Sequence, residues 1–240
     1  MGILRTINQV FNYTNSISKI LRYPKIYVSE ISDSLYCEWR KVLELNYGKV
    51  RTKEMREGTK IHKEFLSFNI SDIDEAEIQI QSGRSVSFPA KVGFIHKEKK
   101  LMVSGQVDSA FFYQDRVVKI LEFKTRKNPK IYESDILQAG IYALSFEEMI
   151  GKELDDLEIQ IVVGQRVDRG SRKHNGSAYS SKVEINISES YRFKEIKKYV
   201  SKKLDYILDF WSGRREPNVA FSKDICNNCH FYRICNRKIL

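Results

Sequence analysis

The chain has 240 residues, of which 42% are hydrophobic and 12% aromatic, enough to bury one substantial core. Its 41 Lys and Arg residues exceed its 31 Asp and Glu residues, and the formal net charge of +10 favours a polyanionic partner. The sequence has no run of 18 apolar residues and no apolar core of a signal peptide near its start, which excludes a membrane-spanning helix and leads us to expect a cytoplasmic, globular protein.

The first 29 residues contain basic residues but no Asp or Glu. Mitochondrial transit peptides can have the same composition, and the opening letters MGILRT fit the loose pattern of N-myristoylation. We prefer an amphipathic helix packed on the domain, because apolar residues recur at helical spacing. These residues are Ile3, Leu4, Ile7, Val10, Phe11, Ile17, Ile20 and Leu21.

Helices are predicted next. After Pro24, a helix begins at Ser29 or Ser32 and runs toward Leu45, since either serine could cap it. A second helix is predicted over residues 52–68, with apolar residues on one side.

The hydrophobic period then changes to two, which predicts strands separated by turn signals. These strands cover residues 77–81, 85–94, 101–112 and 116–124. A helix capped near Ser134 and ending at Gly151 follows. Two more strands are predicted over residues 157–165 and 182–188, on either side of a basic loop, and a long amphipathic helix is predicted over residues 188–213.

Two charged residues interrupt the strand around LEFK. Alternation places Glu122 and Lys124 on one face of the strand and Leu121 and Phe123 on the other. A solvent-exposed strand at the edge of a sheet would also explain this pattern, without any functional role for the two residues. Asp108 is a second charged residue in an otherwise apolar strand, and antiparallel pairing would bring it beside Glu122. Two carboxylates placed together repel unless a cation lies between them, so the pair suggests a divalent metal site.

Two helical segments offer further polar groups. His62 lies in GTKIH, and imidazole as a ligand would shift metal preference from magnesium toward manganese. A helical histidine on the surface or in the core is the alternative. Gln138 and Tyr142 are four residues apart in QAGIYAL and therefore share a helical face. They could hold water or substrate, or they could be ordinary surface and core residues.

The four segments GTKIH, GQVDSAFF, ILEFKT and QAGIYAL resemble, in order and approximate spacing, the motifs of RecB-like nucleases of the PD-(D/E)xK superfamily. The resemblance implies an α+β fold with a central mixed β-sheet flanked by helices. It also implies that His62, Asp108, Glu122 and the backbone carbonyl of Phe123 bind Mn²⁺ or Mg²⁺, that Lys124 is catalytic, and that Gln138 and Tyr142 lie beside the site. The sequence departs from the pattern where Gly105, Gln106 and Val107 precede Asp108 without the expected proline.

The chain has four cysteines, the number that a site with four thiolate ligands needs. Cys226, Cys229 and Cys235 are clustered in the sequence, whereas Cys37 is distant from them. One alternative is a structural zinc ion, with His230 as a substitute ligand, and another is that the thiols are unrelated to one another. A disulfide framework is not expected in so large a chain without an export signal. The pattern resembles that of the Cas-four family of CRISPR-associated nucleases, although Glu38 stands where that family has proline. The resemblance implies an iron–sulfur cluster, 4Fe-4S rather than 2Fe-2S.

We therefore expect a single nuclease domain over residues 1–240. Residues 1–70 form a helical part with Cys37 and His62, residues 71–187 the sheet core, and residues 188–240 the last helix and the cysteine-rich segment that closes a helical lobe.

The expected function is metal-dependent cleavage of DNA, mainly as a single-strand exonuclease and also as an endonuclease. The resemblance implies processing of prespacers in CRISPR adaptation beside the integrase proteins. Alternatives are a replication, repair or viral single-strand nuclease, and an inactive DNA-binding subunit. Backbone contacts to DNA are expected from the basic loop, through Arg166, Arg169, Arg172 and Lys173.

Overall fold

The computed structural model describes residues 2–50, 52, 56–57, 72–167 and 182–239. Its centre is a six-stranded mixed sheet with the order β1-β3-β4-β5-β6, and β2 pairs with β3 from the other side. Pairing is parallel between β1 and β3 and between β4 and β5, and antiparallel elsewhere. The strands are β1 (Lys25–Tyr27), β2 (Val86–His96), β3 (Leu101–Tyr113), β4 (Arg116–Thr125), β5 (Glu158–Val167) and β6 (Lys182–Arg192).

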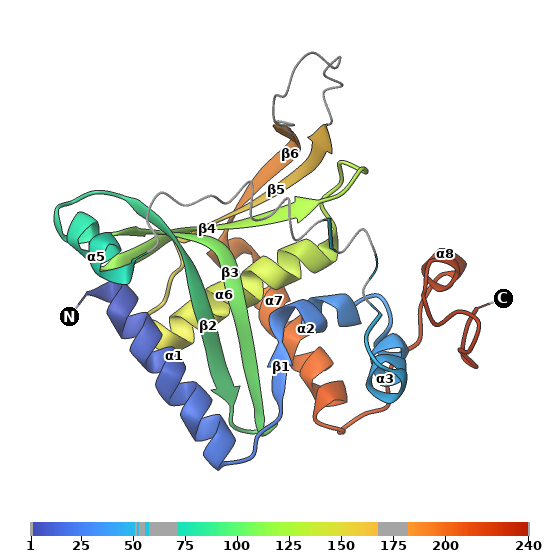
Figure 1. Ribbon diagram of the computed structural model, residues 1–240. Helices are drawn as coiled ribbons and strands as arrows, with labels where there is room; N and C mark the ends of the chain where they lie inside the picture. The colour runs from blue at the N-terminus through green and yellow to red at the C-terminus, as the bar shows by residue number, and fades with distance from the viewer. Residues whose placement is uncertain (1, 51, 53–55, 58–71, 168–181, 240) are drawn as a thin grey trace, which may run out of the picture.

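Helices cover this sheet, as Figure 1 shows. α6 packs against β2, β3, β4 and β5 and is the central helix of the fold, while α7 packs on α6 and α1 packs on β2. The described helices are α1 (Ile3–Ile20), α2 (Val28–Ser34), α3 (Glu38–Tyr47), α5 (Ile73–Gln81), α6 (Glu133–Ile150), α7 (Phe193–Trp211) and α8 (Lys223–Asn227). The observed class is α+β with a mixed sheet flanked by helices, as expected.

Close packing of α6 against α7 depends on a glycine. A Cβ atom added to Gly140 would lie 2.4 Å from Cγ2 of Val200, so only a residue without a side chain fits there. Gly151 ends α6 in the left-handed conformation, with φ 69°, as the sequence predicts. Twelve residues of α6 are buried, which fixes the rotation of the helix over the sheet.

The N-terminal segment forms the predicted amphipathic helix. Ile3, Leu4, Ile7 and Phe11 of α1 are buried in the main core. The apolar face is shorter than predicted, because Ile20 is 74% exposed. Among the described residues, no helix is both long and apolar enough to span a bilayer.

One predicted strand is wrong. Residues 77–81 form the end of α5, whose first turn is capped by Asp72, since its side chain accepts a hydrogen bond of 2.6 Å from the backbone N–H of Asp74. Ala76, Glu77 and Ile80 are buried at helical spacing while Ile78 is 66% exposed. The alternation of Ile and Gln therefore reflects one side of a helix rather than one face of a strand.

Three predicted helix boundaries also move. The helix expected between residues 29 and 45 is split into α2 and α3, and it begins at Val28. The helix expected from residue 188 begins at Phe193, because β6 continues through Arg192 to pair with β5. The N-cap of α6 is Tyr132 rather than Ser134. Most of the helix predicted over residues 52–68 lies outside the described residues.

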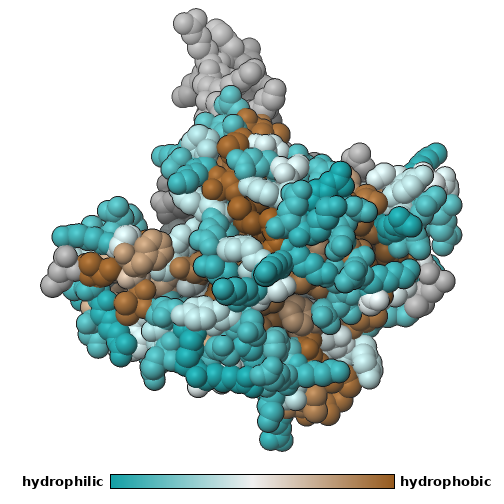
Figure 2. All heavy atoms as spheres, turned by 180° about the vertical axis from the view of Figure 1, so that it is seen from behind, coloured by the Kyte–Doolittle hydropathy of each residue, from teal (hydrophilic) through white to brown (hydrophobic). Residues whose placement is uncertain are grey.

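The back of the molecule is mainly hydrophilic (Figure 2). Apolar side chains gather there over β5 and β6 and over the C-terminal segment around α8. Phe221 and Ile234, which flank α8, are 75% and 54% exposed.

Candidate active site

The site begins at a fork in the sheet. On one side of β3, residues Met102–Ser104 pair with β1, and residues Ser109–Tyr113 pair with β4. Asp108 lies directly before the second pairing, which begins with Ser109 opposite Leu121 of β4. Its carboxylate oxygen Oδ2 accepts a hydrogen bond of 2.9 Å from the backbone N–H of Phe123. The side chain of Asp108 thus continues the link between β3 and β4 where the backbone ladder stops.

The alternation predicted for β4 is present. Glu122 and Lys124 face α6, and Glu122 is only 2% exposed. Phe123 points to the other face and packs with Val162, Leu121 and other apolar residues. A solvated edge strand is excluded, because β4 pairs with both β3 and β5 and its charged residues are covered by a helix.

Gln138 of α6 connects the charged residues. Its amide nitrogen donates hydrogen bonds to Oε1 of Glu122 at 2.7 Å and to the hydroxyl of Tyr142 at 3.2 Å. Its amide oxygen accepts from Nζ of Lys124 at 2.8 Å. Lys124 also forms an ion pair of 2.9 Å with Glu122. The five residues predicted to be catalytic therefore lie in one place, on two strands and one helix. They are Asp108, Glu122, Lys124, Gln138 and Tyr142.

The electrostatics hold both potential proton donors in their protonated forms. Burial is the largest influence on Lys124 and lowers its pKa, yet the nearby carboxylates, first those of Glu122 and Asp135, outweigh burial and raise the pKa above the usual lysine value. Burial, together with the charge of Glu122, raises the pKa of Tyr142 well above its usual value. Lys124 is therefore a cation and Tyr142 a neutral hydroxyl at neutral pH.

The position of Tyr142 depends on Gly105. A Cβ atom added to Gly105 would lie 2.5 Å from Cε1 of Tyr142, so the ring occupies the space above this glycine of β3. Gly105 belongs to the segment in which the sequence lacks the expected proline. Ser32 of α2 contributes from the other side, where its hydroxyl lies 3.3 Å from Oε1 of Gln138.

A cavity of about 410 Å³ opens beside Lys124. It reaches from Gln138 across the end of β4 to the start of α6. Its lining is polar and consists of Ser32, Asp33, Tyr36, Lys124, Arg126, Asn128, Tyr132, Ser134, Asp135 and Gln138. A polar, charged ligand fits such a lining better than an apolar one.

Asp108 and Glu122 have the chemistry to share a hard divalent cation, and each is adjacent in sequence to a member of the cross-strand pair Ser109 and Leu121. His62, the third predicted ligand, lies outside the described residues. Within the parts of the chain that the structure describes, no three His, Cys, Asp or Glu side chains lie close enough to hold a metal ion. The metal site thus stays a prediction.

The four cysteines line a second, larger cavity of about 730 Å³, between α3 and the segment around α8. All four are free thiols, and Cys226 is buried. Burial raises the pKa of the Cys37 thiol, whose sulfur accepts hydrogen bonds from the backbone N–H groups of Arg40 and Ala220. His230, the alternative zinc ligand, is exposed and does not line the cavity. The thiols share a cavity, but the cluster itself stays a prediction.

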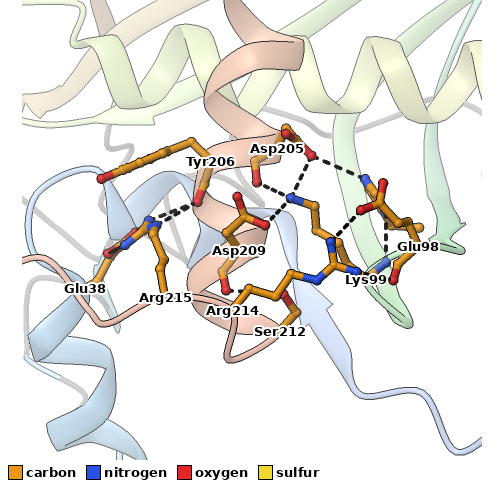
Figure 3. A network of polar contacts seen from close by, with 10 residues as sticks. Glu38, Glu98, Lys99, Asp205, Tyr206, Asp209, Ser212, Arg214 and Arg215 are labelled. Carbon is orange, nitrogen blue, oxygen red and sulfur yellow. Dashed lines mark hydrogen bonds and ion pairs between the residues drawn. The ribbon is translucent and has the colours of Figure 1, made fainter.

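An ion pair joins the N-terminal and C-terminal segments beside this cavity (Figure 3). Glu38 is 1% exposed and binds the guanidinium group of Arg215 through both carboxylate oxygens. It also accepts a hydrogen bond of 2.8 Å from the backbone N–H of Asn218. The guanidinium group lies 3.9 Å from the centre of the Tyr206 ring. Glu38, which replaces the proline of the resembled family, thus holds α3 against the end of α7.

A second ion-pair group holds the other side of α7. Lys99, in the turn between β2 and β3, is almost fully buried and contacts carboxylate oxygens of Asp205 at 2.7 Å and Asp209 at 2.6 Å. Arg214 pairs with Glu98 of the same turn. Figure 3 shows that the last turns of α7 lie between these two sets of contacts.

The predicted DNA-binding residues fall mostly outside the described part of the chain. Arg169, Arg172 and Lys173 lie there. Arg166 is in β5, where its backbone pairs with Val183. Their contribution to DNA binding stays a prediction.

Several polar residues of the site were not predicted. Ser32, Arg126 and Asp135 join it through tertiary packing, although Arg126 continues the alternation of Glu122 and Lys124 along the strand. The alternation in the sequence could therefore have indicated that Arg126 lies on the same face as Glu122 and Lys124. No comparable signal marks Ser32, which is brought to Gln138 by the packing of α2 against α6.

Comparison with known proteins relates the chain to one curated protein. Over 150 residues it is 25% identical to the "CRISPR-associated exonuclease Cas4/endonuclease Cas1 fusion" of Leptospira interrogans serogroup Icterohaemorrhagiae serovar Lai (strain 56601). The match covers 59% of this chain and 24% of that protein, so the chain matches about a quarter of its relative's length. No protein-family model matches the sequence.

Among solved structures, "Crystal structure of SSO0001" aligns with 98% of this chain and 96% of that chain, with a TM-score of 0.47 and 12% identity. The sequence relation makes the chain similar to a CRISPR-associated nuclease protein.

Proposed function

We propose that the chain is a metal-dependent nuclease that cleaves DNA. The observation that carries the proposal is the network of Glu122, Lys124, Gln138 and Tyr142 beside Asp108, in which a half-buried lysine is kept charged next to a buried carboxylate. The similarity to a CRISPR-associated exonuclease/endonuclease fusion supports the same reaction class.

Each described residue has a role in this chemistry. Lys124 is a cation at the edge of the polar cavity, so it stabilises negative charge that develops on a phosphate during hydrolysis and orients the attacking water. Gln138 holds Lys124 and Glu122 at fixed positions through opposite ends of its amide. Tyr142 stays protonated and completes the hydrogen bonding of Gln138.

Asp108, Glu122 and the carbonyl oxygen of Phe123 would hold Mn²⁺ or Mg²⁺ together with His62. A divalent ion at this place supplies Lewis acidity toward the phosphate and lowers the pKa of a bound water. The proposal assigns His62 on the sequence alone, because it lies outside the described residues.

The four cysteines would hold a 4Fe-4S cluster with a structural role. Four thiolates are the donors that such a cluster takes, the four free thiols line one cavity, and the sulfur of Cys37 accepts backbone hydrogen bonds. In the described structure no three of these thiols lie close enough together to hold a metal ion. The cluster would join the segment before α3 to the segment around α8. Catalysis would then depend on it only through the shape of the protein.

DNA with single-stranded ends is the proposed substrate, and processing of prespacers beside CRISPR integrase proteins is the proposed role. The net charge of +10 favours binding to the DNA backbone. Arg166, Arg169, Arg172 and Lys173 are proposed to contribute to it. A replication, repair or viral nuclease would use the same chemistry on the same class of substrate.

The test is cleavage of a labelled single-stranded oligodeoxynucleotide in the presence of manganese. Lys124→Ala should lower the rate by roughly 10³-fold while leaving DNA binding intact, because it removes charge stabilisation that acts mainly in the transition state. Arg116→Ala, which removes an exposed cation from the far end of β4, is the matched control. Equal cleavage by wild type and Lys124→Ala would refute the catalytic role, and binding without cleavage by wild type would indicate a DNA-binding subunit.

A further inference from the structure

Two cations line the polar cavity, Lys124 and Arg126, and the proposed chemistry does not use Arg126. It follows β4 directly and continues the row of Glu122 and Lys124 along the same face of the strand. Residues two apart in an extended chain are separated by about 6.6 Å. Arg126 therefore lies one step beyond Lys124 in the same cavity.

Its guanidinium group is held from two sides. Nη2 donates to Oδ1 of Asp135 at 2.7 Å, and Nη1 donates to the carbonyl oxygen of Lys130 at 3.3 Å. The guanidinium carbon lies 4.6 Å from the centre of the Tyr132 ring. The backbone of Arg126 is fixed as well, because its N–H donates to the carbonyl oxygen of Gly164 in β5.

The anchor of this arrangement is Asp135, whose side chain is 5% exposed. Its Oδ2 accepts from the backbone N–H of Tyr132 at 2.8 Å, so the same carboxylate caps α6 and orients Arg126. A guanidinium group has five N–H donors, and two of them are used in contacts with the described residues. The side chain is 20% exposed, toward the cavity that also contains Lys124.

We propose that Arg126 binds a phosphate next to the scissile phosphate and thereby sets the register of the DNA strand at Lys124, with Asp135 and Tyr132 as positioning residues. An oriented fork of N–H donors is the group best suited to a phosphate oxygen pair. This inference rests on the proposed nuclease function. A purely structural pair, in which Arg126 only ties β4 to the start of α6, is the competing explanation.

The test combines a protein change with a change in the DNA. A labelled single-stranded oligodeoxynucleotide is prepared with an uncharged methylphosphonate at the linkage on either side of the cleaved one. For wild type, one of these substitutions should lower kcat/KM by about 10–100-fold, the value of one charge-assisted phosphate contact. Arg126→Ala should lower kcat/KM on the natural strand by a similar factor and should be insensitive to that methylphosphonate. Arg116→Ala, which removes an equal charge from the other end of β4, should behave as wild type.

A structural role predicts different results. If wild type loses less than about twofold with a methylphosphonate at either linkage, no neighbouring phosphate is bound and the inference is overturned, whether or not Arg126→Ala folds. It is also overturned if a folded Arg126→Ala variant keeps the wild-type kcat/KM. Arg126→Lys keeps the charge but not the fork, so it should recover part of the loss on the natural strand.

Failure of the nuclease proposal is recognised separately. If wild type does not cleave, the inference is decided by equilibrium binding of the same oligodeoxynucleotides without divalent metal. A binding constant about 10-fold weaker for Arg126→Ala, but unchanged for Arg116→Ala, supports a phosphate contact at Arg126. Equal binding by wild type and Arg126→Ala overturns it.

Discussion

Glu122 is the residue on which the polar network depends. From the sequence, Glu122 and Lys124 are expected to serve chemistry and to burden folding, because carboxylates around an empty metal site repel. The contacts change that expectation. Glu122 balances the charge of Lys124 at 2.9 Å and accepts a hydrogen bond from Gln138, so its removal leaves a largely buried cation without its main counter-charge.

We therefore predict that Glu122→Ala destabilises the metal-free protein by about 3 kcal/mol, as expected when one partner of a buried ion pair is removed. Glu122→Gln also removes the counter-charge but keeps an oxygen that accepts hydrogen bonds from Lys124 and Gln138, so it should lose less than Glu122→Ala. Both variants should lose cleavage. Urea unfolding in the presence of EDTA measures the difference, and equal stability of wild type and Glu122→Ala would contradict the prediction.

For single residues, the sequence predicts which face of a strand each side chain occupies, but not which side chains it contacts. The period of two places Glu122 and Lys124 together and opposite to Phe123, and the structure agrees. The contact from Gln138 to both charges could not be predicted, because it depends on the rotation of α6 over the sheet. That rotation is set by the packing of α6 on its neighbours, including the close approach of Gly140 to Val200 of α7.

Among the elements, the linkage of α3 to the end of α7 has the clearest energetic consequence. We predict that Arg215→Ala destabilises the protein by about 3 kcal/mol, because Glu38 is left buried without its counter-charge. Arg214→Ala is the matched control. It removes a neighbouring cation whose partner Glu98 is 72% exposed, and such pairs contribute at most about 1 kcal/mol.

Thermal unfolding of the two arginine variants measures this difference. An equal fall of the melting temperature in both variants would show that the buried ion pair of Glu38 contributes no more to stability than the exposed pair of Glu98. A third variant, Glu38→Gln, removes the buried charge itself and should lie between wild type and Arg215→Ala.

The elements also mark where local pattern fails. Residues 77–81 alternate like a strand, yet the cap at Asp72 and burial at helical spacing make them part of α5. The break between α2 and α3 was missed because Cys37 adopts an extended conformation, with φ −169° and ψ 107°, that no local residue enforces. Strands β2 to β5 were predicted to within two residues at each end, since apolar residues recur in each between clear turn signals, whereas β6 continues four residues beyond the predicted end at residue 188.

For the whole molecule, the cysteine cavity is the main question. We predict that protein purified without oxygen contains iron and sulfide, and that Cys229→Ala loses both together with about 10 °C in melting temperature. Asn227→Ala, an exposed change two residues before Cys229, should keep both. Stoichiometric zinc without iron would contradict the cluster and leave a structural zinc site in its place.

The position of the cysteines has a consequence for biosynthesis. The cavity needs Cys37 from before α3 and three cysteines from after α7, so strands β2 to β6 lie between its two walls in the order of translation. Chains are made from the N-terminus at about 5–20 residues per second. The ribosome therefore releases Asp108, Glu122 and Lys124 well before Cys226. Any group held by the four thiols is therefore inserted after the strands of the sheet have been synthesised. A nascent chain that ends after α7 contains the residues of the polar network but lacks three of the four cysteines.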